Sequence, residues 1–410
     1  MKKLIDYINT HWDDTLRYTP SDDGDIIGLP YRFTSPSIGK LHSALFYWDT
    51  YFTNEGLILS DKIGYAIDNI ENIAYLINKF GYMPNGNRTY FLNRSQPPFF
   101  SLMVKRVYSI TKDKEWLFRM FSAMETEWNF WQEKRQTPIG LNRYYHAMGD
   151  IETETLIEKS ELERRIPFFK NYDRQSLYDI TAFYKIVCES GWDCNSRMGL
   201  DNTSYAWVDL NSLLYGMERD MAYFAEELGR DSSVWKERCE ARRALVNKYL
   251  WNEERGMFCD YDFANGKKSD FLSAAAYYPL FAGLADAEQA EAMAEKVCLL
   301  DFEYGVASCE KRDGIFGFQW DYPTGWAPLN YIMIKGLCDY GYTHIAKGIA
   351  EKYCALVERA FEKTGDVWEK YDIETGKPAA REGVERRMMG WSAGIYLWCK
   401  SFCINRSAVS

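Results

Sequence analysis

The sequence predicts an all-α fold built from about a dozen helices. Apolar residues recur at helical spacing in one segment after another. In residues 61–80, for example, Ile63, Ile67 and Ile70 share one face, and Gly81 ends the pattern. No series of alternating apolar and polar residues accumulates, which argues against a large sheet. Loops rich in glycine, proline, aromatic and polar residues separate the helices. We expect these loops to form a cleft on one side of the molecule.

The helices follow one another along the whole chain. A short helix over residues 1–12 precedes a polar stretch that ends near residue 40, which we interpret as an N-terminal extension. Further helices are predicted over residues 61–80, 100–107, 114–134, 177–188, 210–228, 234–250, 273–281, 286–298, 329–340, 345–362 and 391–402. Residues 256–268 could form a small hairpin, because they contain an Asn-Gly turn. No linker, charge block or repeat of fixed period divides the chain. We therefore expect a single domain over residues 1–410.

The composition narrows the classes of function. Of the 410 residues, 47% are hydrophobic and 16% aromatic, which is ample for a large core. The net charge of −10 argues against nucleic acid or an anionic membrane surface as a partner, since both attract basic patches. No run reaches the roughly 18 apolar residues of a membrane span, and residues 1–10 lack an apolar stretch of signal-peptide length. A neutral, small-molecule substrate fits best.

The ten cysteines are scattered and form no Cys-x-x-Cys pair, and the chain has only four histidines. Neither pattern suits a metal site, so we expect no metal and no cofactor. Cysteines that lie within helical patterns behave as small buried hydrophobes. From these unpaired thiols we expect a reducing, cytoplasmic location.

Tryptophan is followed directly by a carboxylate at five places. Trp12-Asp13 lies in the polar N-terminal stretch without aromatic neighbours, whereas the other four pairs, each near a predicted helix boundary, begin at Trp48, Trp192, Trp320 and Trp368. Because buried carboxylates are costly, core packing alone explains such pairs poorly. A flat indole face beside hydrogen-bonding groups suits a sugar ring, which has C–H faces and equatorial hydroxyls. The pairs therefore indicate a carbohydrate site.

Around these pairs the sequence resembles the trehalase family of inverting α-glucosidases, a family of (α/α)6-barrel glycoside hydrolases. Five stretches carry the resemblance in family order: residues 47–52 (Tyr-Trp-Asp-Thr-Tyr-Phe), 83–98 (from Met-Pro-Asn-Gly-Asn-Arg to Arg-Ser-Gln-Pro-Pro), 189–193 (Glu-Ser-Gly-Trp-Asp), 319–328 (Gln-Trp-Asp-Tyr-Pro-Thr-Gly-Trp-Ala-Pro) and 368–372 (Trp-Glu-Lys-Tyr-Asp). The resemblance implies a double ring of helices with long active-site loops. It also implies hydrolysis of an α-glucosidic bond, in trehalose or a related small α-glucoside.

The resemblance assigns roles to individual residues. Asp193 falls at the position of the general acid and Glu369 at that of the general base. An apolar wall from Trp192 would help to keep the acid protonated. Substrate-binding positions fall on Tyr47, Trp48, Asp49, Asn85, Arg94, Gln96, Trp192, Gln319, Trp320, Asp321, Trp326 and Glu382. Taken singly, Asp193 and Asp49 could instead cap helices, Glu369 could form a surface ion pair, and Arg94 could neutralise a buried carboxylate.

Two departures from the family pattern concern the leaving-group side. Leu41 stands where trehalases carry an arginine that reaches substrate, and residues 151–155 lack the arginine found there in the family. A lysine such as Lys40 cannot reproduce the two-pronged contact of an arginine. We therefore expect weak hydrolysis of trehalose and better turnover of another α-glucoside, such as glucosylglycerate or an α-linked disaccharide.

Two other classes of function remain open. A catalytically silent sugar-binding protein could use the same scaffold, although both candidate carboxylates are present. A terpene cyclase is also helical and lined by aromatic residues, but it needs an Asp-Asp-x-x-Asp cluster on a helix. The pairs at residues 13–14 and 22–23 lie in loop-like sequence instead. The sequence does not indicate an oligomeric state.

Overall fold

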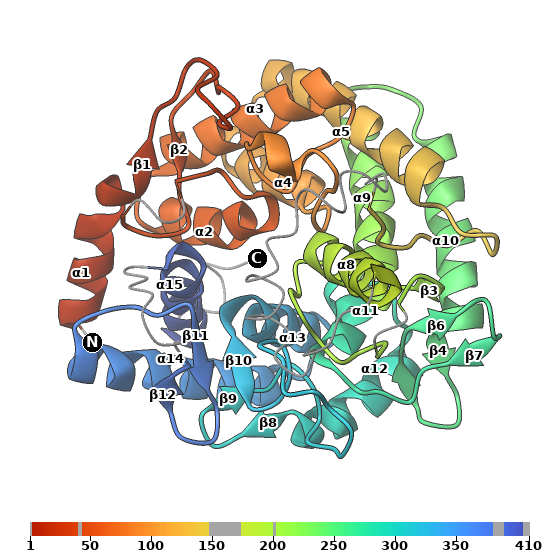
Figure 1. Cartoon of the computed structure of the whole chain (residues 1–410). Coiled ribbons are helices and arrows are strands. Elements are labelled where there is room, and N and C mark those ends of the chain that lie inside the picture. The colour runs from red at the N-terminus through yellow and green to blue at the C-terminus, as the bar shows by residue number, and fades with distance from the viewer. Residues whose placement is uncertain (1, 40–42, 147–173, 200–201, 380–388, 405–410) are drawn as a thin grey trace.

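The computed structural model describes residues 2–39, 43–146, 174–199, 202–379 and 389–404, in which helices predominate. The helices form two concentric rings (Figure 1). Within the described ranges the inner ring consists of α2 (Tyr47–Leu59), α4 (Phe100–Thr111), α9 (Val208–Glu227), α11 (Tyr278–Phe281), α13 (Ala327–Asp339) and α15 (Gly390–Ile404). Each inner helix contacts the next, and α15 packs on α2 to close the ring. The all-α prediction is confirmed.

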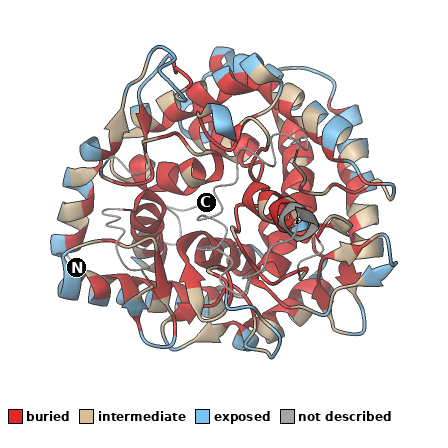
Figure 2. Cartoon of the chain, viewed as in Figure 1, coloured by how far each residue is buried: buried red, intermediate tan, exposed pale blue. Residues whose placement is uncertain are grey.

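An outer helix precedes each inner one in the chain. The outer helices are α1 (Lys2–His11), α3 (Ile63–Phe80), α5 (Lys114–Arg135), α10 (Ser233–Leu250), α12 (Ala287–Glu295) and α14 (Thr343–Thr364). A further helix, α8 (Arg174–Glu189), lies between α5 and α9 in the sequence. Inner helices are buried on nearly all sides, whereas outer helices bury one face and expose the other (Figure 2). The sequences of α1, α3 and α14 account for part of this difference, because their apolar residues gather on one face of each helix.

Two glycines let the ring close between its first and last helices. A Cβ atom on Gly394 of α15 would lie 2.3 Å from the carbonyl oxygen of Phe52, and one on Gly56 of α2 would lie 2.4 Å from Cα of Gly394. No side chain fits at such distances, so the two backbones touch directly. The first turn of α2 carries candidate substrate residues, and this contact fixes that turn against α15.

Local sequence signals explain several helix ends. Asp113 caps α5 by accepting hydrogen bonds from the amides of Glu115 and Trp116. Asp286 and Gln289 form a reciprocal capping box at α12. The alternative role of Asp49 as a helix cap is not supported, because helix α2 begins at Tyr47 with Phe46 as its N-cap, and Asp49 lies inside its first turn.

The strands are short and connect the helices. Five small antiparallel groups are described: β1 (Leu16–Arg17) with β2 (Phe33–Thr34); β3 (Tyr205–Ala206) with β6 (Tyr261–Asp262) and β7 (Lys267–Lys268); β4 (Trp251–Asn252) with β5 (Met257–Phe258); β8 (Asp301–Phe302) with β9 (Gly305–Val306); and β10 (Thr324–Trp326) with β11 (Lys370–Asp372) and β12 (Lys377–Pro378). The predicted hairpin is present but narrower than residues 256–268, because β5 pairs with β4 and only β6 and β7 flank the Asn-Gly turn.

The N-terminal segment packs onto the rings. Leu4, Ile8 and Trp12 are buried, and the indole N–H of Trp12 donates to Oγ of Ser60 at 2.9 Å. One continuous apolar cluster of described residues extends from Leu4 to Phe402. This shared core supports the proposal of a single domain, onto which the described residues of the N-terminal extension pack.

Candidate active site

Most candidate residues lie in loops that lead into an inner helix, and Tyr47, Trp48 and Asp49 lie in the first turn of α2 itself. Residues 43–46 precede α2, residues 81–99 precede α4, residues 190–207 precede α9, residues 307–326 precede α13, and the stretch from residue 365 precedes α15. Contacts between these loops bring their candidate residues together, although they are far apart in the sequence. Glu382 lies outside the described residues, as do Leu41 and residues 151–155.

The loop that contains Asp193, the acid loop (residues 190–199), packs directly on Trp48. Gly191 has a φ of +75°, and a Cβ there would lie 2.7 Å from Cε2 of the Trp48 indole. Only glycine suits both the backbone conformation and the available space. Trp192 is fully buried, whereas Asp193 keeps part of its surface exposed. The backbone on the N-terminal side of Asp193 is therefore held tightly, while the Asp193 side chain stays partly exposed.

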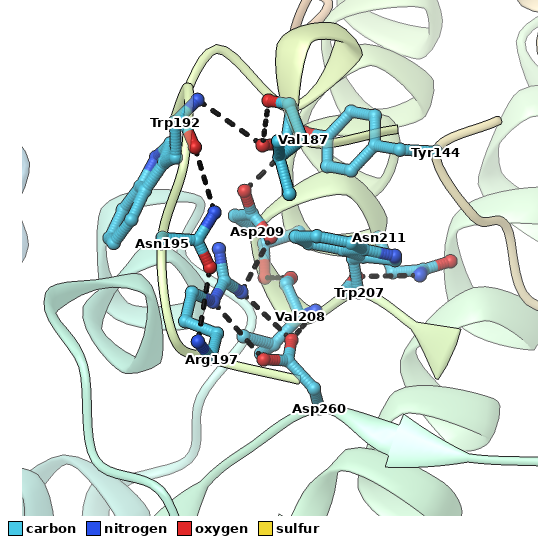
Figure 3. A network of polar contacts seen from close by, with 12 residues as sticks. Tyr144, Val187, Trp192, Asn195, Arg197, Trp207, Val208, Asp209, Asn211 and Asp260 are labelled. Carbon is cyan, nitrogen blue, oxygen red and sulfur yellow. Dashed lines mark hydrogen bonds and ion pairs between the residues drawn. The ribbon is translucent and has the colours of Figure 1, made fainter. Parts of the chain in front are cut away.

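A buried cation holds the far end of the acid loop (Figure 3). The guanidinium of Arg197 donates to both carboxylate oxygens of Asp260, at 3.1 and 2.8 Å, and to Asp209 at 3.0 Å. It lies between the indoles of Trp192 and Trp207, 4.7 and 5.0 Å from their ring centroids. Charge-assisted hydrogen bonds of this kind are strong and directional. This network fixes the orientation of Trp192, the neighbour of Asp193.

One side chain, Gln319, joins the acid loop to Lys370, the first residue of β11 and the neighbour of Glu369. Its amide nitrogen donates to the carbonyl oxygen of Asp193 at 2.9 Å, and its amide oxygen accepts from Nζ of Lys370 at 2.9 Å. Lys370 in turn forms an ion pair with Glu369, with Nζ 3.5 Å from Oε2. Trp326 supports this bridge, since its indole N–H donates to the carbonyl oxygen of Gln319. One amide thus links the backbone of Asp193 to Lys370, the ion-pair partner of Glu369.

Glu369 is held at the start of β11. Its backbone carbonyl accepts from the indole N–H of Trp391 at 3.0 Å and from Oγ of Ser392 at 3.4 Å, both on α15. Its side chain keeps 18% of its surface exposed. The adjacent ammonium of Lys370 favours the ionised form of a carboxylate, which is the form that a general base requires. The partial exposure leaves Glu369 able to meet a ligand.

Five tryptophans form a contiguous aromatic cluster beneath the loops. Trp320 stacks face to face on Trp326, with centroids 3.8 Å apart and planes 3° apart, and on Trp192 at 5.3 Å. It also lies 5.6 Å from Trp48, which meets Trp391 edge to face at 6.0 Å. These rings come from four different loops or helices, so the cluster locks the loops together. Trp320 and Trp326 are almost completely buried, which favours a supporting role over direct sugar contact.

Asp321 ties two loops together with both carboxylate oxygens. One accepts from the amide of Ser196 at 2.9 Å, and the other accepts from the Ser196 hydroxyl at 2.6 Å and from the amide of Phe318 at 2.9 Å. Burial raises the pKa of Asp321, and these hydrogen bonds oppose that rise. With its acceptors engaged in this way, Asp321 anchors the acid loop, so its predicted contact with sugar is not favoured by this geometry.

The loop before α4, which contains Asn85, Arg94 and Gln96, is largely buried. The Asn85 amide nitrogen donates to the carbonyl oxygens of Ser95 and Cys188, each at 3.3 Å. Gln96 accepts from the amide of Trp48 at 3.2 Å. Arg94 is only 7% exposed, and its Nη1 donates to Asn93 at 2.9 Å. Its Nε meets no acceptor among the described residues, which suits a cation prepared for a ligand.

Tyr47 and Asp49, both in the first turn of α2, occupy different environments. The hydroxyl of Tyr47 donates to Oε1 of Glu127 at 2.5 Å and accepts from the amide of Phe100 at 3.0 Å, so it faces the core. Asp49 is half-buried. The structure therefore favours Asp49 over Tyr47 as a sugar contact.

Comparison with known proteins decides the family. The profile of the Trehalase family matches residues 26–402.

The chain belongs to the trehalase family.

Curated relatives agree with this family. The periplasmic trehalase of Pseudomonas aeruginosa is 32% identical over 425 residues, covering 96% of this chain and 75% of that protein. The periplasmic trehalase of Xanthomonas campestris is 31% identical over 428 residues, covering 96% of this chain and 72% of that protein. These matches confirm the resemblance drawn from the five motifs. As a member of the trehalase family, the protein is a glycoside hydrolase.

Solved structures extend the agreement to the fold. The neutral trehalase of Saccharomyces cerevisiae superposes with a TM-score of 0.77 at 28% identity, covering 97% of this chain and 80% of that one. A mannosylglycerate hydrolase from Thermus thermophilus superposes with a TM-score of 0.67 at 19% identity, covering 97% of this chain and all of that one. The second likeness bears on the fold alone. Together they confirm the (α/α)6 barrel for this trehalase family member.

The expectation of a cytoplasmic location is contradicted, because the curated relatives are periplasmic trehalases. The argument from unpaired cysteines failed for a physical reason. Most of the thiols are buried, and burial raises the pKa of Cys239, for example, to about 11. A buried, protonated thiol resists oxidation in any compartment, so the lack of disulfide pairs says little about location.

Two structural features bear on membrane association and metal binding. Of the helices that the structure describes, none is both long and apolar enough to cross a membrane. Within the same residues, no group of three or more His, Cys, Asp or Glu side chains is arranged to hold a metal ion.

Sequence reasoning missed the roles of Gly191 and Glu189, and it missed the link from Lys370 to Gln319. All three residues stand inside the quoted motifs, but these roles depend on contacts with Trp48, Arg135 and Gln319 that the sequence does not show. Glu189 is fully buried and paired with Arg135. A carboxylate beside an apolar helical pattern was a usable signal for a buried ion pair.

Proposed function

We propose that this member of the trehalase family hydrolyses α-glucosidic bonds with inversion of configuration, and that α,α-trehalose is the first candidate substrate. The observation that carries the proposal is the Gln319 bridge, which couples the backbone of Asp193 to Lys370, the ion-pair partner of Glu369. Inverting hydrolysis needs two carboxyl groups on opposite sides of the scissile bond. The names of the curated relatives support trehalose as the substrate.

In this proposal Asp193 is the general acid. It donates its proton to the glycosidic oxygen as the bond between that oxygen and the anomeric carbon breaks. Glu369 is the general base and removes a proton from a water molecule, whose oxygen forms the new bond to the anomeric carbon from the opposite face. The proton lost by Asp193 leaves with the released alcohol, and Glu369 gains the proton of the water. The ammonium of Lys370 supports the ionised form of Glu369.

The surrounding residues are proposed to hold the reacting glucose. Arg94 offers N–H donors from a nearly buried guanidinium, and Asp49 offers acceptors at the start of α2. Trp48 and Trp192, which are as deeply buried as Trp320 and Trp326, support the acid loop from beneath. Asn85 and Gln96 hold the loops through hydrogen bonds described above, and their remaining polar atoms could meet sugar hydroxyls. Excluding water from such a site strengthens each polar contact with the substrate.

A pair of near-isosteric variants tests the roles of the carboxyl groups. Asp193→Asn and Glu369→Gln should each abolish turnover while preserving the melting temperature, because each removes proton transfer, typically worth about 10²–10⁴-fold in rate. Neither change alters the volume of the side chain appreciably. If either variant keeps more than about a tenth of the wild-type rate, the proton-transfer role of that residue is wrong.

A second candidate substrate is another small α-glucoside. The observation that favours it is Leu41, which replaces an arginine on the leaving-group side of the family pattern. Loss of a polar contact costs about 1–3 kcal/mol if no other group compensates. Comparing kcat/KM for trehalose, kojibiose, nigerose, sucrose and glucosylglycerate distinguishes the candidates. A clear preference for trehalose would mean that another part of the chain supplies the missing donor.

A further inference from the structure

We propose that the Arg135–Glu189 ion pair is a positioning element that holds the sugar-binding loop and the acid loop in register. The sugar-binding loop is defined here as residues 93–96, and the acid loop as residues 190–199, as above. This inference rests on the proposed function, since it concerns the same site. Neither residue is among those to which the family resemblance assigns a role.

The carboxylate of Glu189 sits where three segments meet. It is fully buried at the last residue of α8. One oxygen, Oε1, accepts from the backbone amide of Ser95 and from Nη2 of Arg135, each at 2.8 Å. The other, Oε2, accepts from Nε of Arg135 at 2.9 Å and from the backbone amide of Tyr145 at 2.5 Å. Both oxygens are therefore shared between Arg135 and a backbone amide.

Each of these contacts leads directly to a candidate functional residue. Ser95 stands between Arg94 and Gln96 in the sugar-binding loop, so its amide fixes the backbone from which both side chains project. Glu189 stands four residues before Asp193. A second link runs in parallel, because Asn85 donates to the carbonyl oxygens of Ser95 and Cys188. The ion pair thus lies at the junction of the two loops.

The short connection from Glu189 to Asp193 is stiff. The hydroxyl of Ser190 donates to the carbonyl oxygen of Val187 and accepts from the amide of Trp192. Gly191 packs against the Trp48 indole. A displacement of Glu189 would therefore move Asp193 by almost the same distance. Because a misplacement of about 1 Å can cost on the order of 10²-fold in rate, the ion pair should matter for catalysis without touching substrate.

The arrangement needs a carboxylate and an arginine specifically. An amide at position 189 would replace one acceptor oxygen with an N–H donor, which would face two donors whichever way the amide is turned. A lysine at position 135 would keep the positive charge but lose the two parallel N–H groups of the guanidinium fork. A shortened carboxylate in Glu189→Asp would keep the charge and both acceptors but reach less far.

The chain offers a matched control in Arg242 and Glu218. This pair has the same two-pronged geometry: Nε of Arg242 lies 3.0 Å from each oxygen of Glu218, and Nη2 lies 2.9 Å from Oε1. Its burial is similar, with side chains 5% and 1% exposed, against 5% and 0% for Arg135 and Glu189. It joins α10 to α9 and contacts none of the candidate substrate residues.

The experiment compares Glu189→Gln, Glu189→Asp and Glu218→Gln in the full chain. Melting temperature, kcat and KM are measured on the best α-glucoside, and the rise in melting temperature caused by glucose is measured in parallel. Both glutamine variants should lower the melting temperature. At a temperature where all variants are folded, Glu189→Gln should lose at least about tenfold in kcat/KM, whereas Glu218→Gln should stay within about twofold of wild type. Glu189→Asp should recover part of the loss, which a purely structural role would not predict.

Two results would overturn the inference. One is wild-type kcat/KM in Glu189→Gln, and the other is an equal loss in Glu218→Gln. If Glu189→Gln does not fold, kcat/KM of Glu189→Asp and of Arg135→Lys is compared with that of Glu218→Gln instead. Failure of the proposed function can be told apart from failure of this inference, because in the first case the wild type itself would cleave no α-glucoside. The positioning role is then tested by the rise in melting temperature that glucose causes. This rise should be smaller in Glu189→Gln than in Glu218→Gln, and equal rises would refute the positioning role.

Discussion

Substituting Gly191 with alanine tests how tightly the acid loop is held. At φ +75°, a residue with a Cβ pays a backbone penalty of about 1–2 kcal/mol. The new methyl group would also lie 2.7 and 2.9 Å from two carbons of the Trp48 indole. That indole cannot retreat, because Phe52, Trp320 and Trp391 surround it. Overpacking of this kind costs about 1–3 kcal/mol more.

Gly199 provides the control within the same loop. Its φ is +62°, and a Cβ there would meet nothing within 4 Å. Gly199→Ala therefore carries only the backbone penalty. Chemical denaturation should show that Gly191→Ala is less stable than Gly199→Ala by about 1–3 kcal/mol. Steady-state kinetics should show a loss of kcat/KM on the order of 10²-fold in Gly191→Ala alone. Equal stability of the two variants, or full activity of Gly191→Ala, would refute the argument that this contact positions Asp193.

Three further changes test other parts of the account. Lys370→Met removes the ammonium beside Glu369, so the acidic limb of the kcat/KM profile should move to higher pH; an unmoved limb would contradict the electrostatic role of Lys370. Asp321→Asn should lower both melting temperature and activity, since one of its two acceptor atoms becomes a donor; loss of activity without loss of stability would indicate a sugar contact instead. Burial raises the pKa of Glu127 to about 8 from an ordinary 4.5, so the folded chain keeps a proton that the unfolded chain releases, and stability should fall as pH rises from about 4.5 to 8. Glu127→Gln stays neutral throughout, and its melting temperature should change less than that of wild type between pH 5 and pH 8.

The fold was predictable because its signals are local. Helical periodicity and glycine stops appear within short windows, and they located most of the helices. Closure of the ring was not predictable in this way, because it depends on the contact between Gly56 and Gly394, which are far apart in the sequence. Helix α2 was not among the predicted helices, because it is buried on nearly all sides and so lacks an amphipathic stripe, and no capping side chain marks its start.

The candidate site was predictable to the level of loops but not of side-chain contacts. The motifs identified the loops that carry Asp193 and Glu369, since the residue types occur in a recognisable order. A motif does not reveal which way a side chain faces. Tyr47 and Asp321 were predicted to contact substrate, yet each is buried and hydrogen-bonded to other parts of the protein. Glu189 was overlooked because its partner Arg135 lies far away in the sequence.

The anomeric configuration of the first product tests the central claim most directly. Proton NMR can follow cleavage of an α-glucoside in real time, before the released glucose equilibrates. If Asp193 and Glu369 act as acid and base on opposite faces of the sugar, the glucose released from the cleaved side must appear first as the β-anomer. Initial release of the α-anomer would indicate retention and a covalent intermediate, and it would contradict the proposed mechanism.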